Sequence, residues 1–261
     1  MCGIFGFKLN RPVLLAEVIK LLEKLEVHQY AGEPNPVGGY GAGIAILNSD
    51  GSLLLEKIGK AGDVSPVRKL AELVKVNEAR VLMAHVRMPS PQFMETARFR
   101  EVTQPYVAAC HDGLKVVSVH NGYIRNYEAL KEELGNEHIL ESERFGLIDS
   151  EVIPHCFEEI LKANDDIDEA VHTLQNMLEG QMAISILQMD MQGAFLHLIH
   201  KGRTRGLTVW TNNAGEFVFC SRKEPLESEF SGVLVEGKFE EMVCIPWQQE
   251  KNIKLTFTLK S

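Results

Sequence analysis

The chain opens on Met1-Cys2-Gly3-Ile4-Phe5-Gly6-Phe7, a β-prone stretch in which a cysteine directly follows the first methionine. If Met1 is removed, Cys2 carries a thiol and a free α-amine on one residue. A nucleophile and a candidate base then lie within reach of each other. A cysteine at the start of a strand is more often a small buried hydrophobic residue. The rest of the chain must therefore decide the role of Cys2.

The overall composition excludes several classes of protein. The 261 residues fit one large domain or two small ones, and an apolar fraction of 45% is enough for a sizeable core. A formal net charge of -9 argues against a nucleic-acid or membrane-surface partner, because their phosphate groups would not be attracted. No apolar run is long enough to cross a bilayer, and the first residues lack the pattern of a secretory signal. We therefore expect a cytoplasmic protein.

The cysteines give no sign of a disulfide framework or a zinc site. The five are odd in number and widely scattered, and none forms a C-x-x-C pair. We therefore expect no metal and no cofactor.

The sequence predicts helices among strands up to about residue 178 and only strands after it. Apolar residues at helical spacing predict an amphipathic helix from Pro12 to about His28. Further helices are expected at about 66–76, 126–134, 149–163 and 166–178. Strands are expected at 2–7, 43–48, 52–58, 80–87, 105–110, 114–119, 182–188, 194–200, 206–210, 216–220, 239–245 and 253–259. This order predicts an α+β fold with mostly antiparallel sheets in one layered domain.

Residues 31–43 contain two prolines and five glycines and are predicted to form an irregular loop. A surface connection is the simplest interpretation, but a glycine-rich loop before a strand can also close over a small ligand. It is not a phosphate-binding loop, because no Gly-Lys-Ser/Thr follows it.

His120-Asn121-Gly122 follows the strand expected at 114–119. One interpretation is a simple Asn-Gly turn. The alternative is an oxyanion hole, in which the Asn121 side-chain amide and the Gly122 backbone N–H converge as two donors.

Arg87 and Asp149 are the two charged residues with the clearest possible roles in binding. Arg87 ends a strand and could make a surface ion pair or bind a carboxylate with two parallel hydrogen bonds. Asp149 precedes a helix and could cap it or pair with a substrate ammonium, and these roles are compatible. Residues 201–205 form a short basic stretch that we interpret as a solvated turn.

These motifs occur in a specific order: Cys-Gly-Ile-Phe-Gly at the N-terminus, Gly-Tyr-Gly-Ala-Gly, His-x-Arg, His-Asn-Gly and Asp-Ser-Glu-Val-Ile. The order resembles the glutaminase domain of class II glutamine amidotransferases, which are N-terminal-nucleophile hydrolases. The similarity covers nearly the whole chain. It implies a four-layer αββα sandwich of two stacked, mostly antiparallel sheets in a single domain spanning residues 1–261, with no synthase domain.

The resemblance also implies roles for individual residues. Cys2 would be the nucleophile and its α-amine the base, while Asn121 and Gly122 would form the oxyanion hole. Arg87 would bind the α-carboxylate of glutamine and Asp149 its α-ammonium.

Further residues would line the glutamine pocket. Ser90 falls near a substrate-binding hydroxyl of the family. Residues 104–106 and the loop at 38–43 resemble other segments around the pocket. That loop lacks the arginine and aspartate common in the family, and Met88 replaces a common aromatic residue, so the entrance of the pocket is expected to differ.

The expected reaction is the hydrolysis of L-glutamine to glutamate and ammonia through a thioester on Cys2. The expected partner is a separate synthase subunit that accepts the ammonia, for instance in a glutamate synthase-like complex. Two alternatives remain: a free-standing hydrolase of another γ-glutamyl amide, and a non-catalytic regulatory or scaffolding relative.

Overall fold

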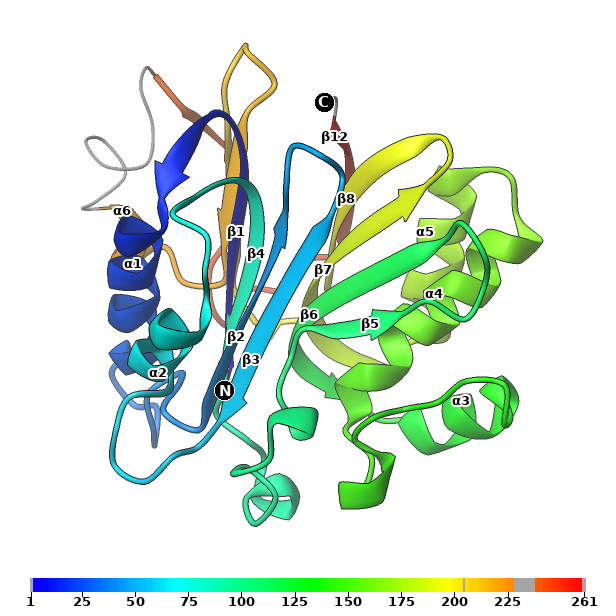
Figure 1. The fold of residues 1–261 in the computed structure, drawn as a ribbon, viewed down its shortest axis with the longest axis horizontal. Coiled ribbons are helices and arrows are strands. Elements are labelled where there is room, and N and C mark those ends of the chain that lie inside the picture. Colours follow the sequence, from blue (N-terminus) through cyan, green and yellow to red (C-terminus); the bar gives the residue numbers. More distant parts are fainter. Residues whose placement is uncertain (1, 204, 228–237, 260–261) are drawn as a thin grey trace.

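Two antiparallel sheets form the centre of the molecule (Figure 1). The computed structural model describes residues 2–203, 205–227 and 238–259, so Met1 lies outside the described residues. The first sheet has the order β11-β9-β10-β1-β4-β2-β3, and the second has the order β12-β8-β7-β6-β5. The strands of the first sheet are β1 (Gly3–Leu14), β2 (Gly41–Leu47), β3 (Leu53–Gly59), β4 (Glu78–Val86), β9 (Leu207–Thr211), β10 (Phe217–Cys220) and β11 (Glu240–Ile245). Those of the second are β5 (Tyr106–Ala108), β6 (Lys115–Ile124), β7 (Gly180–Asp190), β8 (Gly193–Lys201) and β12 (Ile253–Leu259).

Helices cover the outer face of each sheet, which produces four layers. On the first sheet lie α1 (Leu15–Val27) and α2 (Pro66–Leu73), and the short α6 (Glu224–Glu227) contacts α1. On the second lie α4 (Val152–Ala163) and α5 (Ile167–Met177), with α3 (Tyr127–Leu134) packed against α4. Short 3₁₀ helices join these elements: η1 (Pro91–Phe93), η2 (Arg100–Val102), η3 (Glu143–Phe145) and η4 (Asp149–Glu151). The αββα sandwich predicted from the sequence is confirmed.

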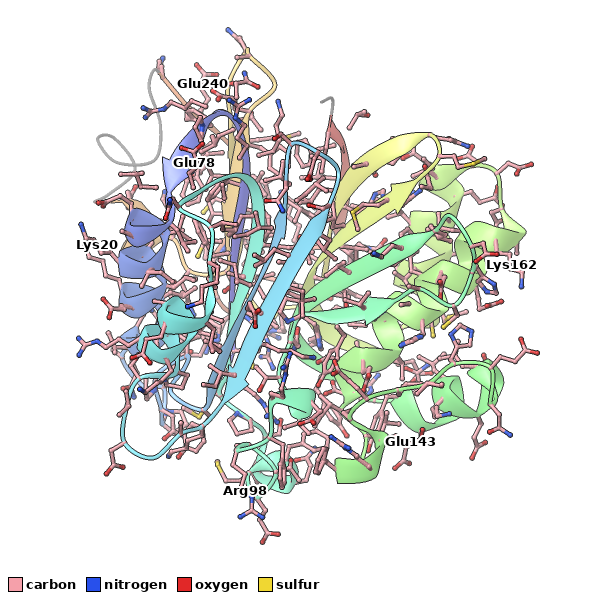
Figure 2. All side chains as sticks on the ribbon, viewed as in Figure 1. Lys20, Glu78, Arg98, Glu143, Lys162 and Glu240 are labelled. Carbon is pink, nitrogen blue, oxygen red and sulfur yellow. The ribbon has the colours of Figure 1, made fainter. Side chains whose placement is uncertain are left out.

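Three of the four apolar clusters formed by the described residues hold these layers together. One lies between the sheets and includes Ile4 of β1 and Val119 of β6. Another joins α1 and α2 to the first sheet, and a third joins α4 and α5 to the second. Charged residues such as Lys20 on α1 and Lys162 on α4 are exposed on opposite sides of the molecule (Figure 2). Each sheet is therefore covered on both faces, which agrees with the runs of consecutive apolar residues in its strands.

Helix α1 illustrates how the sequence forms one outer layer. Its buried residues recur every three or four positions, which places them on one stripe facing the sheet. The stripe consists of Leu15, Val18, Leu21, Leu22 and Leu25.

Within the described residues, no helix combines the length and apolar character needed to cross a membrane.

The structure corrects several predicted boundaries. Strand β1 continues to Leu14, so α1 begins later than the helix predicted from Pro12. Residues 41–43 belong to β2, so only the first part of the glycine-rich segment is a loop. His120-Asn121-Gly122 lies inside β6 and pairs with β7, so the prediction that this motif follows the strand is wrong.

Candidate functional site

Cys2 lies immediately before β1 and is half-buried. Its thiol donates a hydrogen bond to the carbonyl oxygen of Met88, with 3.4 Å between sulfur and oxygen. Side chains alternate between the faces of a strand, so Cys2 shares the face of Ile4, which points between the sheets. The backbone of Ile4 is held by Ser221, whose amide donates to its carbonyl at 2.9 Å and whose hydroxyl accepts from its amide at 3.0 Å. These bonds fix the end of β1 that presents Cys2.

Arg87 follows β4 directly and reaches the same region. Gly3 pairs with Val86 in the antiparallel ladder, so Cys2 and Arg87 are the next opposed pair. The Arg87 side chain is only 4% exposed, and its Nη1 has no hydrogen-bond partner among the described residues. Burial lowers the pKa of Arg87, and this is opposed by the nearby Tyr106, Cys2 and Asp149. A buried guanidinium with a free nitrogen is suited to binding an anion.

Asn121 lies on the inner face of the second sheet. It shares that face with Val117 and Val119, which pack in the cluster between the sheets. The side chain is 2% exposed, and its Oδ1 has no hydrogen-bond partner among the described residues. Asn121 therefore points toward the sheet that carries Cys2, with polar capacity left to bind another group.

The Gly122 backbone N–H points to an edge of β6 that β5 does not cover. The β5–β6 ladder reaches only Ser118. Beyond Ser118, side chains from other segments accept the hydrogen bonds that a neighbouring strand would otherwise accept. The His120 amide donates to Gln104 Oε1, and the Ile124 amide donates to Asp149 Oδ2. Because every second amide of a strand points to the same side, the Gly122 amide points between these two bonds.

A glycine at 122 is also required by packing. A Cβ atom here would lie 2.4 Å from His120 Nε2 and 2.5 Å from the carbonyl oxygen of Gln181. The His120 ring occupies this space and is held through Nδ1, 2.9 Å from Ser150 Oγ. Burial lowers the pKa of His120 to about 3, so the ring is neutral at pH 7.

Asp149 lies at the start of η4 rather than at the N-cap of α4, which is Glu151. Its carboxylate is 5% exposed and accepts the 2.8 Å bond from the Ile124 amide. The interpretation of Asp149 as a helix cap is therefore wrong. Burial raises the pKa of Asp149 to about 6, against the opposing effects of backbone hydrogen bonds and Arg87. At pH 7 Asp149 is therefore mostly a charged carboxylate, buried near the buried guanidinium of Arg87.

Three comparisons with known proteins agree on one family. A family model described as a glutamine amidotransferase domain matches residues 94–228, just over half of the chain. A glutamine–fructose-6-phosphate aminotransferase (isomerizing) of Thermococcus kodakarensis is 42% identical over 195 residues, or 73% of this chain and 28% of that protein. The corresponding protein of Nostoc sp. is 31% identical over 235 residues, or 86% of this chain and 32% of that protein. This chain belongs to the glutamine amidotransferase domain family. The resemblance to class II enzymes is confirmed.

Solved structures support the fold of this glutamine amidotransferase domain. A glutamine phosphoribosylpyrophosphate amidotransferase from B. subtilis superposes with a TM-score of 0.61 at 19% identity, covering 87% of this chain and 43% of that one. A structure titled as the allosteric regulatory enzyme of purine biosynthesis gives a TM-score of 0.60 at 20% identity, with the same coverage. The chain spans about three tenths of the length of the curated relatives named above.

The structure places the remaining predicted residues of the amidotransferase domain around this site. Ser90 is half-buried three residues after Arg87, at the N-cap position of η1, and its hydroxyl makes no capping bond. Gln104 donates to the His120 carbonyl at 3.1 Å as well as accepting from its amide. Tyr106 is fully buried, and burial raises its pKa well above the ordinary value.

Arg205 was predicted to lie in a solvated turn, and its proximity to this site was not predicted. Burial lowers the pKa of Arg205, and the nearby Cys2 and Asp149 oppose that effect. Arg205 therefore lies close to the same site, although it comes from the segment between β8 and β9. Nothing in its local sequence predicts this, because the contact depends on the packing of the two sheets. Thr204 lies outside the described residues.

Proposed function

We propose that this amidotransferase domain hydrolyses the side-chain amide of L-glutamine to glutamate and ammonia, with Cys2 as the nucleophile. The observation that carries the proposal is that Cys2 and Asp149 both lie near the buried guanidinium of Arg87. The guanidinium complements an α-carboxylate and the carboxylate complements an α-ammonium. A glutamine held by these two groups would extend its side-chain amide toward the thiol.

The reaction begins with proton transfer within Cys2 itself. Once Met1 is removed, the free α-amine takes the thiol proton, directly or through a water molecule. An α-amino group with a pKa of about 7.7–8 is unprotonated in roughly a tenth to a fifth of molecules at pH 7. With Met1 attached, this nitrogen is an amide and has no basic lone pair, so removal of Met1 is a condition of the proposal.

The thiolate then attacks the γ-carbonyl carbon of glutamine. The negative charge that develops on the carbonyl oxygen is stabilised by the side-chain amide of Asn121 and the backbone N–H of Gly122. The amine returns its proton to the leaving nitrogen, ammonia departs, and a γ-glutamyl thioester remains on Cys2. Water, deprotonated by the same amine, attacks the thioester and releases glutamate. The loss of one oxyanion donor is expected to cost about 10²–10³ in rate.

We further propose that a synthase domain or subunit uses the ammonia. The similarity to aminotransferases named for glutamine and fructose-6-phosphate supports transfer of the amide nitrogen to an acceptor. A pull-down from the native source, followed by a glutaminase assay with and without the recovered protein, tests this step. Increased glutamine hydrolysis in the presence of a bound synthase supports it, and recovery of no such partner contradicts it.

The central step is tested by trapping Cys2 with a glutamine analogue that carries a diazoketone in place of the amide. Intact mass and peptide mapping should show one adduct, on Cys2 of chains that lack Met1, and excess L-glutamine should slow its formation. Cys2→Ala should remain unlabelled, while Cys244→Ala should be labelled like the wild type. Labelling of another cysteine, or none, would overturn the proposal.

A further inference from the structure

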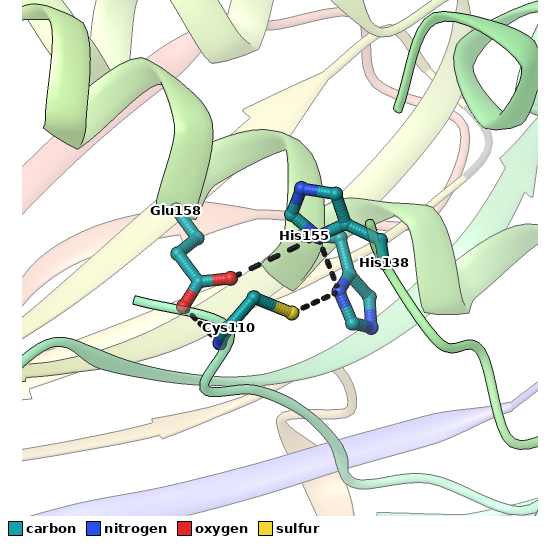
Figure 3. Close-up of side chains that lie close together, drawn as sticks. All are labelled: Cys110, His138, His155 and Glu158. Carbon is teal, nitrogen blue, oxygen red and sulfur yellow. Dashed lines mark hydrogen bonds and ion pairs between the residues drawn. The ribbon is translucent and has the colours of Figure 1, made fainter. Parts of the chain in front are cut away.

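A second cluster of reactive side chains gathers around the N-terminal half of α4 (Figure 3). We call Cys110, His138, His155 and Glu158 the His138 cluster. Cys110 follows β5, His138 lies in the segment after α3, and the other two residues are on α4. Their potential ligand atoms all lie within 4.8 Å of one another.

The distances within the His138 cluster match a tetrahedral metal site. His138 Nδ1 lies 3.0 Å from His155 Nδ1, and Cys110 Sγ lies 3.8 Å from the same His155 atom. Glu158 Oε2 lies 3.9 Å from His138 Nδ1. Zinc bonds of about 2.0–2.1 Å to nitrogen and about 2.3 Å to sulfur place tetrahedral ligand atoms roughly 3.3–3.6 Å apart. Small shifts of these side chains would complete the geometry.

A carboxylate outside the cluster orients one of its imidazoles. Glu159 Oε1 lies 3.0 Å from His138 Nε2 and also binds His111 Nε2. An Nε2–H donated to Glu159 leaves the lone pair of His138 on Nδ1, which faces the cluster. Carboxylates commonly hold metal-binding histidines in this way.

The burial of the His138 cluster is independent evidence that it binds a cation. Glu158 is fully buried, and His138 and His155 are 3% and 2% exposed. Glu158 Oε1 accepts from the Cys110 and His111 amides, but Oε2 has no hydrogen-bond partner among the described residues. A buried carboxylate with an unsatisfied oxygen is costly unless a positive charge lies beside it.

We propose that Cys110, His138, His155 and Glu158 bind a divalent transition-metal ion, for which zinc is the best match. A thiolate and two imidazoles suit zinc and are poor ligands for magnesium or calcium, which prefer oxygen. Four protein ligands leave no open position, which is typical of a structural site rather than a catalytic one. Cys110 is exposed and provides the path by which the ion enters.

Sequence patterns do not predict this site, because its ligands come from three separate segments instead of a C-x-x-C pair. Only His155 and Glu158, three residues apart on one helix, form a local pattern. An ion here would tie the segment after β5 and the segment after α3 to α4. Because η4, which contains Asp149, directly precedes α4, the ion would also stabilise the helix that follows this part of the proposed glutamine site. The metal proposal is independent of the hydrolytic activity and is tested without it.

The first test measures metal content. The full chain, expressed without a histidine tag in zinc-supplemented medium and dialysed, should contain about one zinc per chain by elemental mass spectrometry. Cys110→Ser and His155→Gln should each lose most of the ion, while Cys244→Ser and His172→Gln should retain it. Zinc below a tenth of an equivalent in the wild type, or equal content in all five proteins, would overturn the proposal.

The second test identifies the ligands spectroscopically and remains valid if a variant is unstable. Cobalt(II) added to metal-free protein should give the intense visible bands of a tetrahedral site and a near-ultraviolet thiolate-to-cobalt band. Cys110→Ser should lose the thiolate band, and Glu159→Gln should keep the spectrum but bind about 10–100-fold more weakly. The weak spectrum of octahedral cobalt, unchanged by these substitutions, would contradict the assignment.

Discussion

Asp149 accepts a 2.8 Å hydrogen bond from the backbone amide of Ile124, at the edge of β6 that β5 leaves uncovered. The Gly122 amide, two residues before Ile124 in β6, points to the same uncovered edge. The proposed partner of the substrate ammonium and the proposed oxyanion donor therefore lie side by side along one edge of β6. Their spacing is set by the strand itself, which is a rigid support for a site.

The stability of Asp149→Asn relative to wild type should depend on pH. The folded pKa of about 6 exceeds the ordinary value of 3.8, so the folded state keeps a proton that the unfolded state releases between these values. The contribution of Asp149 to stability is thus present below pH 4 and is lost as the pH rises through 6. Denaturant unfolding should show the difference in stability between variant and wild type moving in favour of the variant by about 2 kcal/mol between pH 4 and 7. A constant difference would contradict the burial argument.

Binding of L-glutamine should weaken in acid for the same reason. Only the charged form of Asp149 pairs with an ammonium, so affinity should fall about tenfold per pH unit below 6. Cys2→Ala, which should bind glutamine without turnover, allows this affinity to be measured by calorimetry without loss of the substrate to hydrolysis. Affinity that is flat between pH 4.5 and 7 would exclude Asp149 as the ammonium partner.

Arg87→Lys should raise KM for glutamine more than it lowers kcat. An ammonium cannot make the two parallel bonds of a guanidinium, and a charged hydrogen bond contributes about 1.5–3 kcal/mol, or 10–100-fold in KM. Arg80→Lys, on the exposed part of the same strand, is the matched control and should behave as wild type. Equal KM values for Arg87→Lys and Arg80→Lys would show that Arg87 does not bind the substrate.

Gly122→Ala should be destabilised by about 1–3 kcal/mol and inactive, because its methyl group would meet His120 and the backbone of Gln181. Gly51→Ala is a useful comparison. Its φ of +81° strains any other residue, but no atom lies within 4 Å of the added carbon. It should lose about 1 kcal/mol through backbone strain and keep full activity. A Gly122→Ala protein with the stability and activity of wild type would contradict the packing inferred around this position.

Retention of Met1 should abolish activity. A lysine inserted between Met1 and Cys2 prevents methionine removal and converts the proposed base into an amide nitrogen, while the thiol remains. Intact mass establishes which form is present, and a glutaminase assay measures its rate. Wild-type rates in the extended protein would refute the α-amine as the base.

The layered fold could be predicted because local patterns and packing agree for most elements. The apolar stripe of α1 and the hairpin of β2 and β3 are examples. The Asn-Gly signal failed because pairing of Asn121 and Gly122 with β7 outweighs the local preference for a turn. The helix-cap signal at Asp149 failed because the buried Ile124 amide needs an acceptor.

The site residues could be proposed from sequence only through the order of their motifs. Arg205 and the His138 cluster could not be foreseen, since their partners lie far away in the chain and meet only when the layers pack. Long-range neighbours of this kind leave no periodic pattern, which is why residue spacing alone misses them.

Glutamate release from L-glutamine by the wild type, Cys2→Ala and Cys244→Ala, each at equal concentration and with intact mass recorded, tests the central claim most directly. The wild type without Met1 and Cys244→Ala should release glutamate and ammonia in equal amounts, and Cys2→Ala should release none above background. Undiminished hydrolysis by Cys2→Ala would contradict the proposal that Cys2 is the nucleophile.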